Sequence, residues 1–252
     1  MRVSLTATAT AATLALLLAG CGDKSAAGNG AAAADTASSA PAVPAPNGGD
    51  WTNVVSKTEA GGFVMGNPNA PVKLIEYGSL TCPHCADFSE HGAPKLIDTY
   101  VKTGKVSYEF RNFVRDPIDL TAALLTRCGG ATPYFKLTDQ IYAAQADWFA
   151  KLQQMSQAEQ QQLQTLQPTQ VTGVIADKAG LLQFVRVRGI PAEKAQACLA
   201  DQAEIQKLVA MNQVATDNFN LTGTPTFVIN GKTVENAANW ETLEPALRNA
   251  VG

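Results

Sequence analysis

Two closely spaced cysteines are the residues of this chain best suited to chemistry. They lie in the stretch TCPHC at residues 81–85, separated by two residues. Such a pair can form a disulfide that other thiols open and close through a mixed disulfide. A c-type haem site would need histidine directly after the second cysteine, where Ala86 stands. A zinc site would need a second ligand pair, in a chain whose only histidines are His84 and His91. The spacing therefore favours a redox-active pair, with a metal site and an inert structural disulfide as alternatives.

A strand and a helix must position this pair. Residues 72–77 are rich in β-branched and aromatic side chains and predict a strand. Apolar residues then recur at helical spacing over residues 83–103, and Pro83 suits the first helical position, where no amide hydrogen is needed. The first turn of this helix has unpaired amides and the positive end of the helix dipole, which stabilise a thiolate on Cys82. His84 adds a donor or a positive charge in the same turn.

The consequence is a predicted division of labour between the two sulfurs. The pKa of the Cys82 thiol is expected to lie below its ordinary value near 8.5 by roughly one to five units. Stabilising the thiolate favours the reduced form, so the disulfide becomes an oxidant. Cys82 is therefore the predicted nucleophile, and Cys85, one turn later, is the partner that closes the disulfide.

This region resembles the DsbA family of thioredoxin-like disulfide oxidoreductases. The resemblance is carried by CPHC at residues 82–85 and by LTGTPTF at residues 221–227, which is similar to the cis-proline loop of that family. It extends over residues 62–251 and implies an α/β, thioredoxin-like fold with a helical domain inserted before the cis-proline hairpin. It also implies a cis peptide bond before Pro225 and a loop in which Thr224 offers its backbone groups to an extended substrate.

Two features of the resemblance bear on the chemistry. Glu76 stands where the family has a buried acid that is thought to exchange protons with the second cysteine. From the residues alone, a carboxylate inside an apolar strand is costly unless it has a role or a partner, but Glu76 could also point to a solvated edge. Thr224 is similar to the residue found in isomerase and reductase relatives, whereas the best-known oxidase has valine there. The direction of electron transfer therefore stays open.

A second cysteine pair lies outside this motif. Cys128 and Cys198 stand at the two ends of the predicted helical domain and can form a structural disulfide. In the chain-entropy model, closing a loop of about 70 residues stabilises a fold by roughly 4 kcal/mol. Two buried, reduced thiols are the alternative.

The first 50 residues carry the signals of export. Residues 1–20 combine a basic start, a short apolar core and small residues before Cys21, which is an export signal too short to span a bilayer. The ending LAGC resembles a bacterial lipoprotein signal, which implies that Cys21 becomes the lipidated N-terminus. An ordinary signal peptide cut elsewhere is the alternative, and Gly22 leaves open which membrane holds the protein. Residues 21–50 are rich in Ala, Pro, Ser and Gly and predict a flexible tether.

Charge and composition bound the remaining possibilities. Removing residues 1–20 takes away Arg2 and no acidic residue, which leaves 18 of the 19 basic side chains against 22 acidic ones. So mild a negative charge argues against nucleic-acid binding. Five cysteines in an exported chain fit an oxidising compartment. We expect no cofactor and no metal, and one folded domain over residues 51–252.

Strand signals occur on both sides of the predicted helical domain. A first strand is expected at 63–65, and an alternating pattern predicts another at 106–113. The Asn-Gly pair at 230–231 predicts a hairpin formed by strands 226–229 and 232–234.

The intervening chain, about residues 116–220, is patterned as helix throughout, with no convincing strand. Pro94 should bend the helix that follows the cysteine motif. The candidate helices are 121–128, 134–145, 156–167, 174–188, 191–201 and 203–219, with 239–250 as a closing helix.

The leading functional hypothesis is a periplasmic, lipid-anchored enzyme that introduces disulfides into unfolded exported proteins. The resemblance implies reoxidation by a membrane partner like DsbB. A disulfide reductase or isomerase with the same site is the second hypothesis. Those relatives are usually dimers with an N-terminal dimerisation domain, for which the tether leaves no room, so we expect a monomer. A non-enzymatic, membrane-tethered carrier of metal or of unfolded proteins is the third hypothesis.

Overall fold

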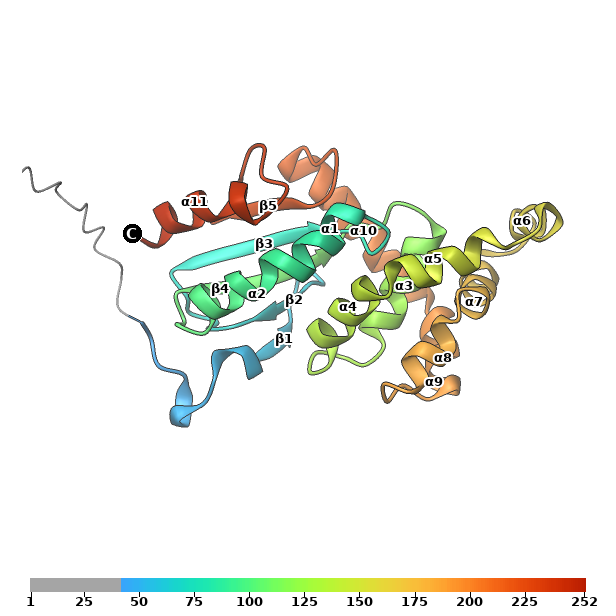
Figure 1. Ribbon diagram of the computed structural model, residues 1–252, viewed down its shortest axis with the longest axis horizontal. Helices are drawn as coiled ribbons and strands as arrows, with labels where there is room; N and C mark the ends of the chain where they lie inside the picture. Colours follow the sequence, from blue (N-terminus) through green and yellow to red (C-terminus); the bar gives the residue numbers. More distant parts are fainter. Residues whose placement is uncertain (1–41) are drawn as a thin grey trace, which may run out of the picture. The chain divides into compact units, whose positions relative to one another are not determined.

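The computed structural model describes residues 42–252, and a six-stranded sheet forms the centre of this part of the chain (Figure 1). The strands are β1 (Val55–Lys57), β2 (Phe63–Met65), β3 (Val72–Gly78), β4 (Val106–Asn112), β5 (Thr226–Ile229) and β6 (Lys232–Thr233). They lie in the order β1-β2-β4-β3-β5-β6. The central strands β3 and β4 run parallel, and every other neighbouring pair is antiparallel.

The sequence predicted five of these strands and missed β1. The predicted strands at 63–65, 72–77, 106–113 and 226–229 are present to within one residue, and the Asn-Gly hairpin leads into a shorter β6. Strand β1 has only three residues, of which Ser56 and Lys57 are exposed. It therefore shows neither the length nor the alternation that identifies a strand in a sequence.

The connection from β3 to β4 is helical but irregular. It consists of α1 (Pro83–Asp87), a π-helical turn (Phe88–Gly92), α2 (Ala93–Leu96) and a second π-helical turn (Ile97–Val101). Pro94, which was expected to bend one long helix, is the second residue of α2, just after the first π-helical turn. Proline has no amide hydrogen and its ring crowds the preceding turn, so the helix accommodates it by widening there.

A block of helices separates β4 from β5, as the sequence predicted. The block comprises α3 (Pro117–Arg127), α4 (Tyr134–Ala143), α5 (Gln145–Gln153), α6 (Gln157–Leu163), α7 (Pro168–Lys178), α8 (Leu181–Arg186), α9 (Ala192–Leu199) and α10 (Gln202–Phe219), and α11 (Trp240–Val251) closes the chain. Helix α5 was missed. The single helix predicted over 174–188 was wrong, because Gly180 adopts φ +73° and separates α7 from α8. The α/β fold class with an inserted helical domain is confirmed.

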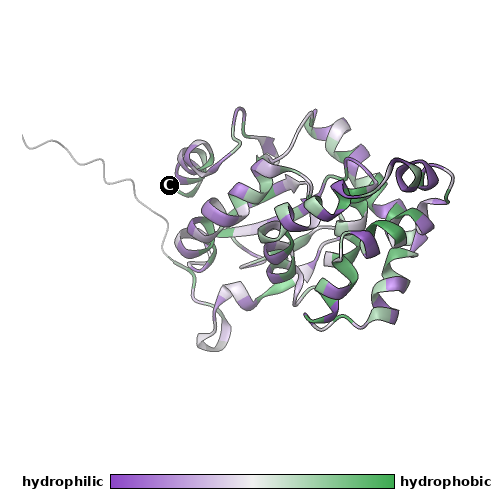
Figure 2. Ribbon diagram, turned by 45° about the vertical axis from the view of Figure 1, so that its right-hand side comes forward, coloured by the Kyte–Doolittle hydropathy of each residue, from purple (hydrophilic) through white to green (hydrophobic). Residues whose placement is uncertain are grey.

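Both faces of the central strands are covered by helices. Alternate residues of a strand point to opposite faces. Glu76 of β3 is the register partner of Phe110, whose ring centroid lies 6.2 Å from that of Tyr134 in α4. Tyr77 points to the other face, where its ring lies 5.7 Å from that of Phe219 in α10. In Figure 2 the helices carry hydrophobic stripes and hydrophilic outer sides, as packing against such a sheet requires.

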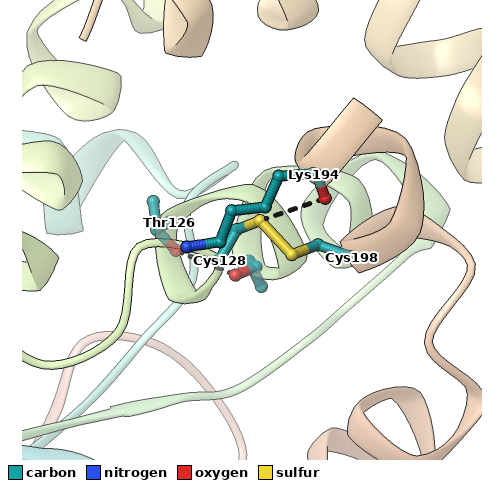
Figure 3. The surroundings of a disulfide bond; sticks show 5 residues. Thr126, Cys128, Lys194 and Cys198 are labelled. Carbon is teal, nitrogen blue, oxygen red and sulfur yellow. Dashed lines mark hydrogen bonds between the residues drawn. A yellow bond between two sulfur atoms is a disulfide. The ribbon is translucent and has the colours of Figure 1, made fainter. Parts of the chain in front are cut away.

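Cys128 and Cys198, for which a disulfide and free thiols were both open, form a disulfide with an S–S distance of 2.03 Å. The bond joins the residue after α3 to helix α9 (Figure 3). The Cys128 sulfur lies 3.5 Å from the carbonyl oxygen of Lys194, one turn before Cys198 in the same helix. The bond thus links two helices of the inserted block.

Removing this disulfide should destabilise the fold without touching the residues of the cysteine motif. The bond closes a sequence separation of 70 residues, so Cys128→Ser with Cys198→Ser is expected to lower the free energy of unfolding by roughly 4 kcal/mol in the chain-entropy model. Urea denaturation of the double variant measures this. A loss below about 1 kcal/mol would mean that the unfolded chain gains little freedom when the bond is absent.

The described chain begins within the predicted tether. The predicted signal at 1–20 and Cys21 lie outside the described residues. Within 42–50, the Val43 amide donates to the Thr103 carbonyl, and Val43 accepts a 2.7 Å hydrogen bond from the Trp51 indole. Over residues 42–252, no helix combines the length and the apolar character needed to cross a membrane.

Candidate active site

The two cysteines of the motif lie where β3 passes into α1. Cys82 is the N-cap residue of α1, with extended backbone angles, and Cys85 lies in the first turn of that helix. Both are free thiols and both are buried, with exposed fractions of 3% for Cys82 and 0% for Cys85. Pro83 occupies the first helical position, as its fixed φ and missing amide hydrogen favour.

The cis-proline loop brings a distant part of the chain to Cys82. The peptide bond between Thr224 and Pro225 is cis. The carbonyl oxygen of Thr224 lies 3.1 Å from the Cys82 sulfur, close enough to accept a hydrogen bond from the neutral thiol. Of the residues that the structure describes, none forms a hydrogen bond with the buried Thr224 hydroxyl. The loop therefore presents backbone and hydroxyl groups directly beside the sulfur.

The environment of Cys82 favours its thiolate. A hydrogen bond from the Cys85 thiol is the largest cause, and it lowers the pKa of Cys82 to about 5 even though burial opposes the shift. The Thr224 side chain, whose hydroxyl can donate to a thiolate, and the backbone amides of Cys85 and His84 lower the pKa further. These amides are the unpaired donors of the α1 N-terminus, as expected from the sequence. His84 contributes through its amide, and its side chain is exposed.

Cys85 has the opposite preference. Burial raises the pKa of the Cys85 thiol well above its ordinary value, and the neighbouring Cys82 and Glu76 act in the same direction. The two sulfurs, one turn apart, therefore differ strongly in acidity. The low pKa of Cys82 makes its sulfur a good leaving group and nucleophile. The high pKa of Cys85 means that its sulfur takes up a proton when the disulfide opens.

Glu76 is buried with an exposed fraction of 1%, so it does not lie at a solvated edge. Its carboxyl oxygen Oε2 accepts a 2.5 Å hydrogen bond from the Tyr108 hydroxyl of the neighbouring strand. Burial raises the pKa of Glu76 to about 8, against the effect of the Tyr108 hydrogen bond. At neutral pH this carboxyl group therefore holds a proton close to the cysteine pair.

Sequence reasoning missed the residues that hold the loop before Cys82. Asp119 accepts hydrogen bonds from the Ser79 hydroxyl and the Leu80 amide, and Gln145 donates to the Leu80 and Cys82 carbonyls. These two residues belong to α3 and α5. The Asp-Pro start of α3 identifies a helix N-terminus in the sequence, but nothing in it shows which loop that helix contacts.

A cavity of about 520 Å³ opens beside the motif. Pro83 of α1 and Tyr142 and Gln145 of the helical block line it together with the carboxylates of Asp87 and Asp139. Burial raises the pKa of Asp139 to about 6, and the Ser89 hydroxyl donates to it. Between residues 42 and 252, no group of three or more His, Cys, Asp and Glu side chains is arranged to hold a metal ion.

Sequence comparison gives a consistent set of relatives. Residues 58–249 match a family model described as thioredoxin. The chain is 28% identical over 183 residues to a Rickettsia bellii protein provisionally named a protein-disulfide oxidoreductase, covering 73% of this chain and 62% of that protein. It is 24% identical over 189 residues to disulfide bond formation protein D of Bacillus subtilis, covering 73% and 77%. The chain thus spans about three-fifths of the Rickettsia protein's length.

Solved structures agree with this family. The crystal structure of a protein-disulfide isomerase from Novosphingobium aromaticivorans is 33% identical, with a TM-score of 0.72, and the match covers 75% of this chain and 96% of that one. Wolbachia pipientis alpha-DsbA1 shares the fold at 23% identity and a TM-score of 0.61, covering 83% and 94%. The family model, matched over residues 58–249, and the 33% identical relative establish that this chain belongs to the thioredoxin family.

Proposed function

We propose that this protein is a thiol:disulfide oxidoreductase that introduces disulfides into exported proteins through Cys82 and Cys85. The observation that carries the proposal is the difference between the two sulfurs. A hydrogen bond from the Cys85 thiol, together with the amides of α1, lowers the pKa of Cys82 to about 5, whereas burial raises that of Cys85. Because the reduced pair is stabilised by the Cys82 thiolate, its disulfide is a strong oxidant.

The reaction begins with the Cys82–Cys85 disulfide. A substrate thiolate attacks the Cys82 sulfur, the disulfide breaks, and Cys85 leaves with the electron pair. The Glu76 carboxyl group, which the Tyr108 hydroxyl holds in place, supplies a proton to Cys85. A second substrate thiolate then attacks the substrate sulfur of the mixed disulfide, and Cys82 leaves as a thiolate. The substrate loses two electrons and gains a disulfide, and the enzyme pair is reduced.

The substrate site lies along the cis-proline loop. An extended substrate beside Cys82 meets the backbone of Thr224, which precedes the cis peptide bond to Pro225, and can pair with it as an added strand. Main-chain hydrogen bonds of this kind do not depend on sequence, which suits a protein that acts on many unfolded chains. The natural substrates are then thiols of newly exported proteins.

Location and partners follow from the sequence. Residues 1–20 direct export, lipid attached to Cys21 anchors the protein, and residues 21–50 act as a tether in the periplasm. A membrane protein like DsbB reoxidises the pair after each cycle. The protein works as a monomer.

A second candidate, a disulfide isomerase or reductase, is favoured by Thr224 before the cis proline and by the 33% identical isomerase. Equilibrating the Cys82–Cys85 pair with glutathione separates the candidates. We expect the pair to be more oxidising than glutathione. It should therefore stay reduced at low ratios of reduced to oxidised glutathione, at which a thioredoxin-like pair is already a disulfide. The rate of Cys82 alkylation should be half-maximal near pH 5. A poise near that of thioredoxin, with the same titration, would favour the reductase. Stoichiometric metal uptake without thiol exchange would favour a carrier.

A further inference from the structure

The loop between β3 and α1 is buried although it has no regular structure. This redox loop comprises residues 79–82, and Ser79, Leu80, Thr81 and Cys82 have exposed fractions of 0%, 0%, 7% and 3%. Backbone groups in such a loop lack ladder partners and must be satisfied by other parts of the chain. Their partners therefore fix the position of Cys82.

Asp119, in the first turn of α3, provides the central contact. Its Oδ2 accepts a 2.6 Å hydrogen bond from the Ser79 hydroxyl and a 3.0 Å bond from the Arg115 amide, and its Oδ1 accepts a 2.8 Å bond from the Leu80 amide. The side chain has an exposed fraction of 1%. One buried carboxylate thus ties the start of α3 to the redox loop at two successive residues.

The other side of the redox loop is held by Arg115, in the connection before α3, and by the helical block. The Arg115 guanidinium donates to the Ser79 and Thr81 hydroxyls, each at 2.8 Å. The Gln145 amide donates to the Leu80 carbonyl at 2.9 Å and to the Cys82 carbonyl at 3.2 Å. The Tyr142 hydroxyl donates to the Ser79 carbonyl at 3.1 Å. All of these contacts come from outside the strand and helix that carry the motif.

We propose that Asp119 is a positioning residue for thiol-disulfide exchange: by holding Ser79 and Leu80 it fixes the Cys82 sulfur against the α1 amides and the Thr224 carbonyl. The inference rests on the proposed function, because it concerns the acidity of the same nucleophile. Asp119 touches neither sulfur nor substrate. It acts through the backbone, and the inserted helical block thereby controls the acidity of a cysteine that it does not contain.

The sign of the effect separates positioning from simple electrostatics. Burial raises the pKa of Asp119 to about 6, so this group is largely neutral near pH 5, where Cys82 titrates. Replacing it by asparagine removes little charge there, and any charge removed weakens a repulsion, so Coulomb's law alone predicts an unchanged or slightly lower Cys82 pKa in an Asp119→Asn variant. Loss of positioning predicts the opposite. The asparagine NH₂ group cannot accept a hydrogen bond, so either the Leu80 amide or the Arg115 amide loses its acceptor, and the redox loop shifts away from the α1 amides.

The experiment is a titration of Cys82 in the full, folded chain. Asp119→Asn is expected to raise the Cys82 pKa by about one unit, which at pH 4 is a roughly tenfold loss of thiolate. Thiolate absorbance at 240 nm and the pH dependence of iodoacetamide alkylation both measure it. The equilibrium constant with glutathione should become less oxidising in step. Ser79→Ala, which removes one hydroxyl and disturbs the fold less, should shift the pKa in the same direction.

Glu204→Gln is the matched control. Glu204 is another carboxylate of the helical block, with 15% of its side chain exposed, and it pairs with Arg127 away from the redox loop. Its loss should lower stability and leave the Cys82 titration unchanged. An unchanged or lowered Cys82 pKa in folded Asp119→Asn would overturn the inference. A wild-type Cys82 that titrates near 9 would instead overturn the proposed function, so the two failures are distinguishable.

Discussion

Replacing Cys82 by serine is expected to abolish thiol-disulfide exchange, lowering the rate by roughly 10³-fold or more. A serine hydroxyl stays protonated at neutral pH and cannot form the disulfide. Cys85→Ser should behave differently. Cys82 remains a thiolate beside the α1 amides, so it still attacks a disulfide, but no second sulfur releases the product. A stable mixed disulfide should accumulate, visible on non-reducing gels and by intact mass.

The second cysteine pair supplies the control for this experiment. Serine at both Cys128 and Cys198 removes the bond that joins the end of α3 to α9. The proposed reaction does not use this bond. Exchange by the folded double variant should continue at the wild-type rate. If Cys82→Ser kept exchange activity, or if the folded double variant lost it, the nucleophile would have been assigned to the wrong cysteine pair.

Replacing Glu76 by glutamine should stabilise the protein in a way that depends on pH. In the folded protein the pKa of Glu76 is raised to about 8, against 4.5 for a free side chain. Between these values the unfolded glutamate loses its proton while the folded one keeps it, so stability is full below pH 4.5 and is lost as pH rises through 8. Glutamine keeps the Tyr108 contact and has no proton to lose. The variant should therefore gain about 4 kcal/mol over wild type by pH 8 to 9, and almost nothing at pH 4.

Urea denaturation at pH 4, 6 and 8.5, with the Cys82–Cys85 pair reduced, measures this difference. Cys82 titrates in both proteins, so its own effect cancels. Glu109→Gln is a suitable control because Glu109 is a buried carboxylate on β4 that pairs with Arg111 at 2.8 Å. Its loss should destabilise, since it leaves Arg111 without its partner. A stability difference for Glu76→Gln that stays constant with pH would show that this carboxyl group is ionised in the folded protein.

The same glutamine variant also tests the proposed proton transfer. Without a carboxyl proton beside Cys85, the first step of exchange should slow, because Cys85 must leave as an uncompensated buried thiolate. If the variant were more stable but slower in exchange, the buried Glu76 carboxyl group would lower the stability of the wild-type protein while it speeds the reaction.

Local signals in the sequence determined the strand before the motif, the helix start at Pro83 and the Asn-Gly hairpin. Each depends on a few neighbouring residues: a fixed φ and a missing amide hydrogen at proline, or the left-handed turn geometry that Asn-Gly accepts. The expected low pKa of Cys82 followed for the same reason, because the Cys85 thiol and the amides that stabilise the thiolate belong to the next few residues of the chain.

The tertiary structure alone decided what surrounds that thiolate. The Thr224 carbonyl reaches Cys82 from 142 positions away, Tyr108 holds the Glu76 carboxyl group, and Asp119 holds the redox loop from the helical block. No local pattern specifies these contacts, because burial and hydrogen-bond partners depend on which distant segments pack together. The sequence by itself therefore pointed to Cys82 as the proposed nucleophile, and packing set the positions of the Glu76 carboxyl group, of the Thr224 loop and of the sulfur itself.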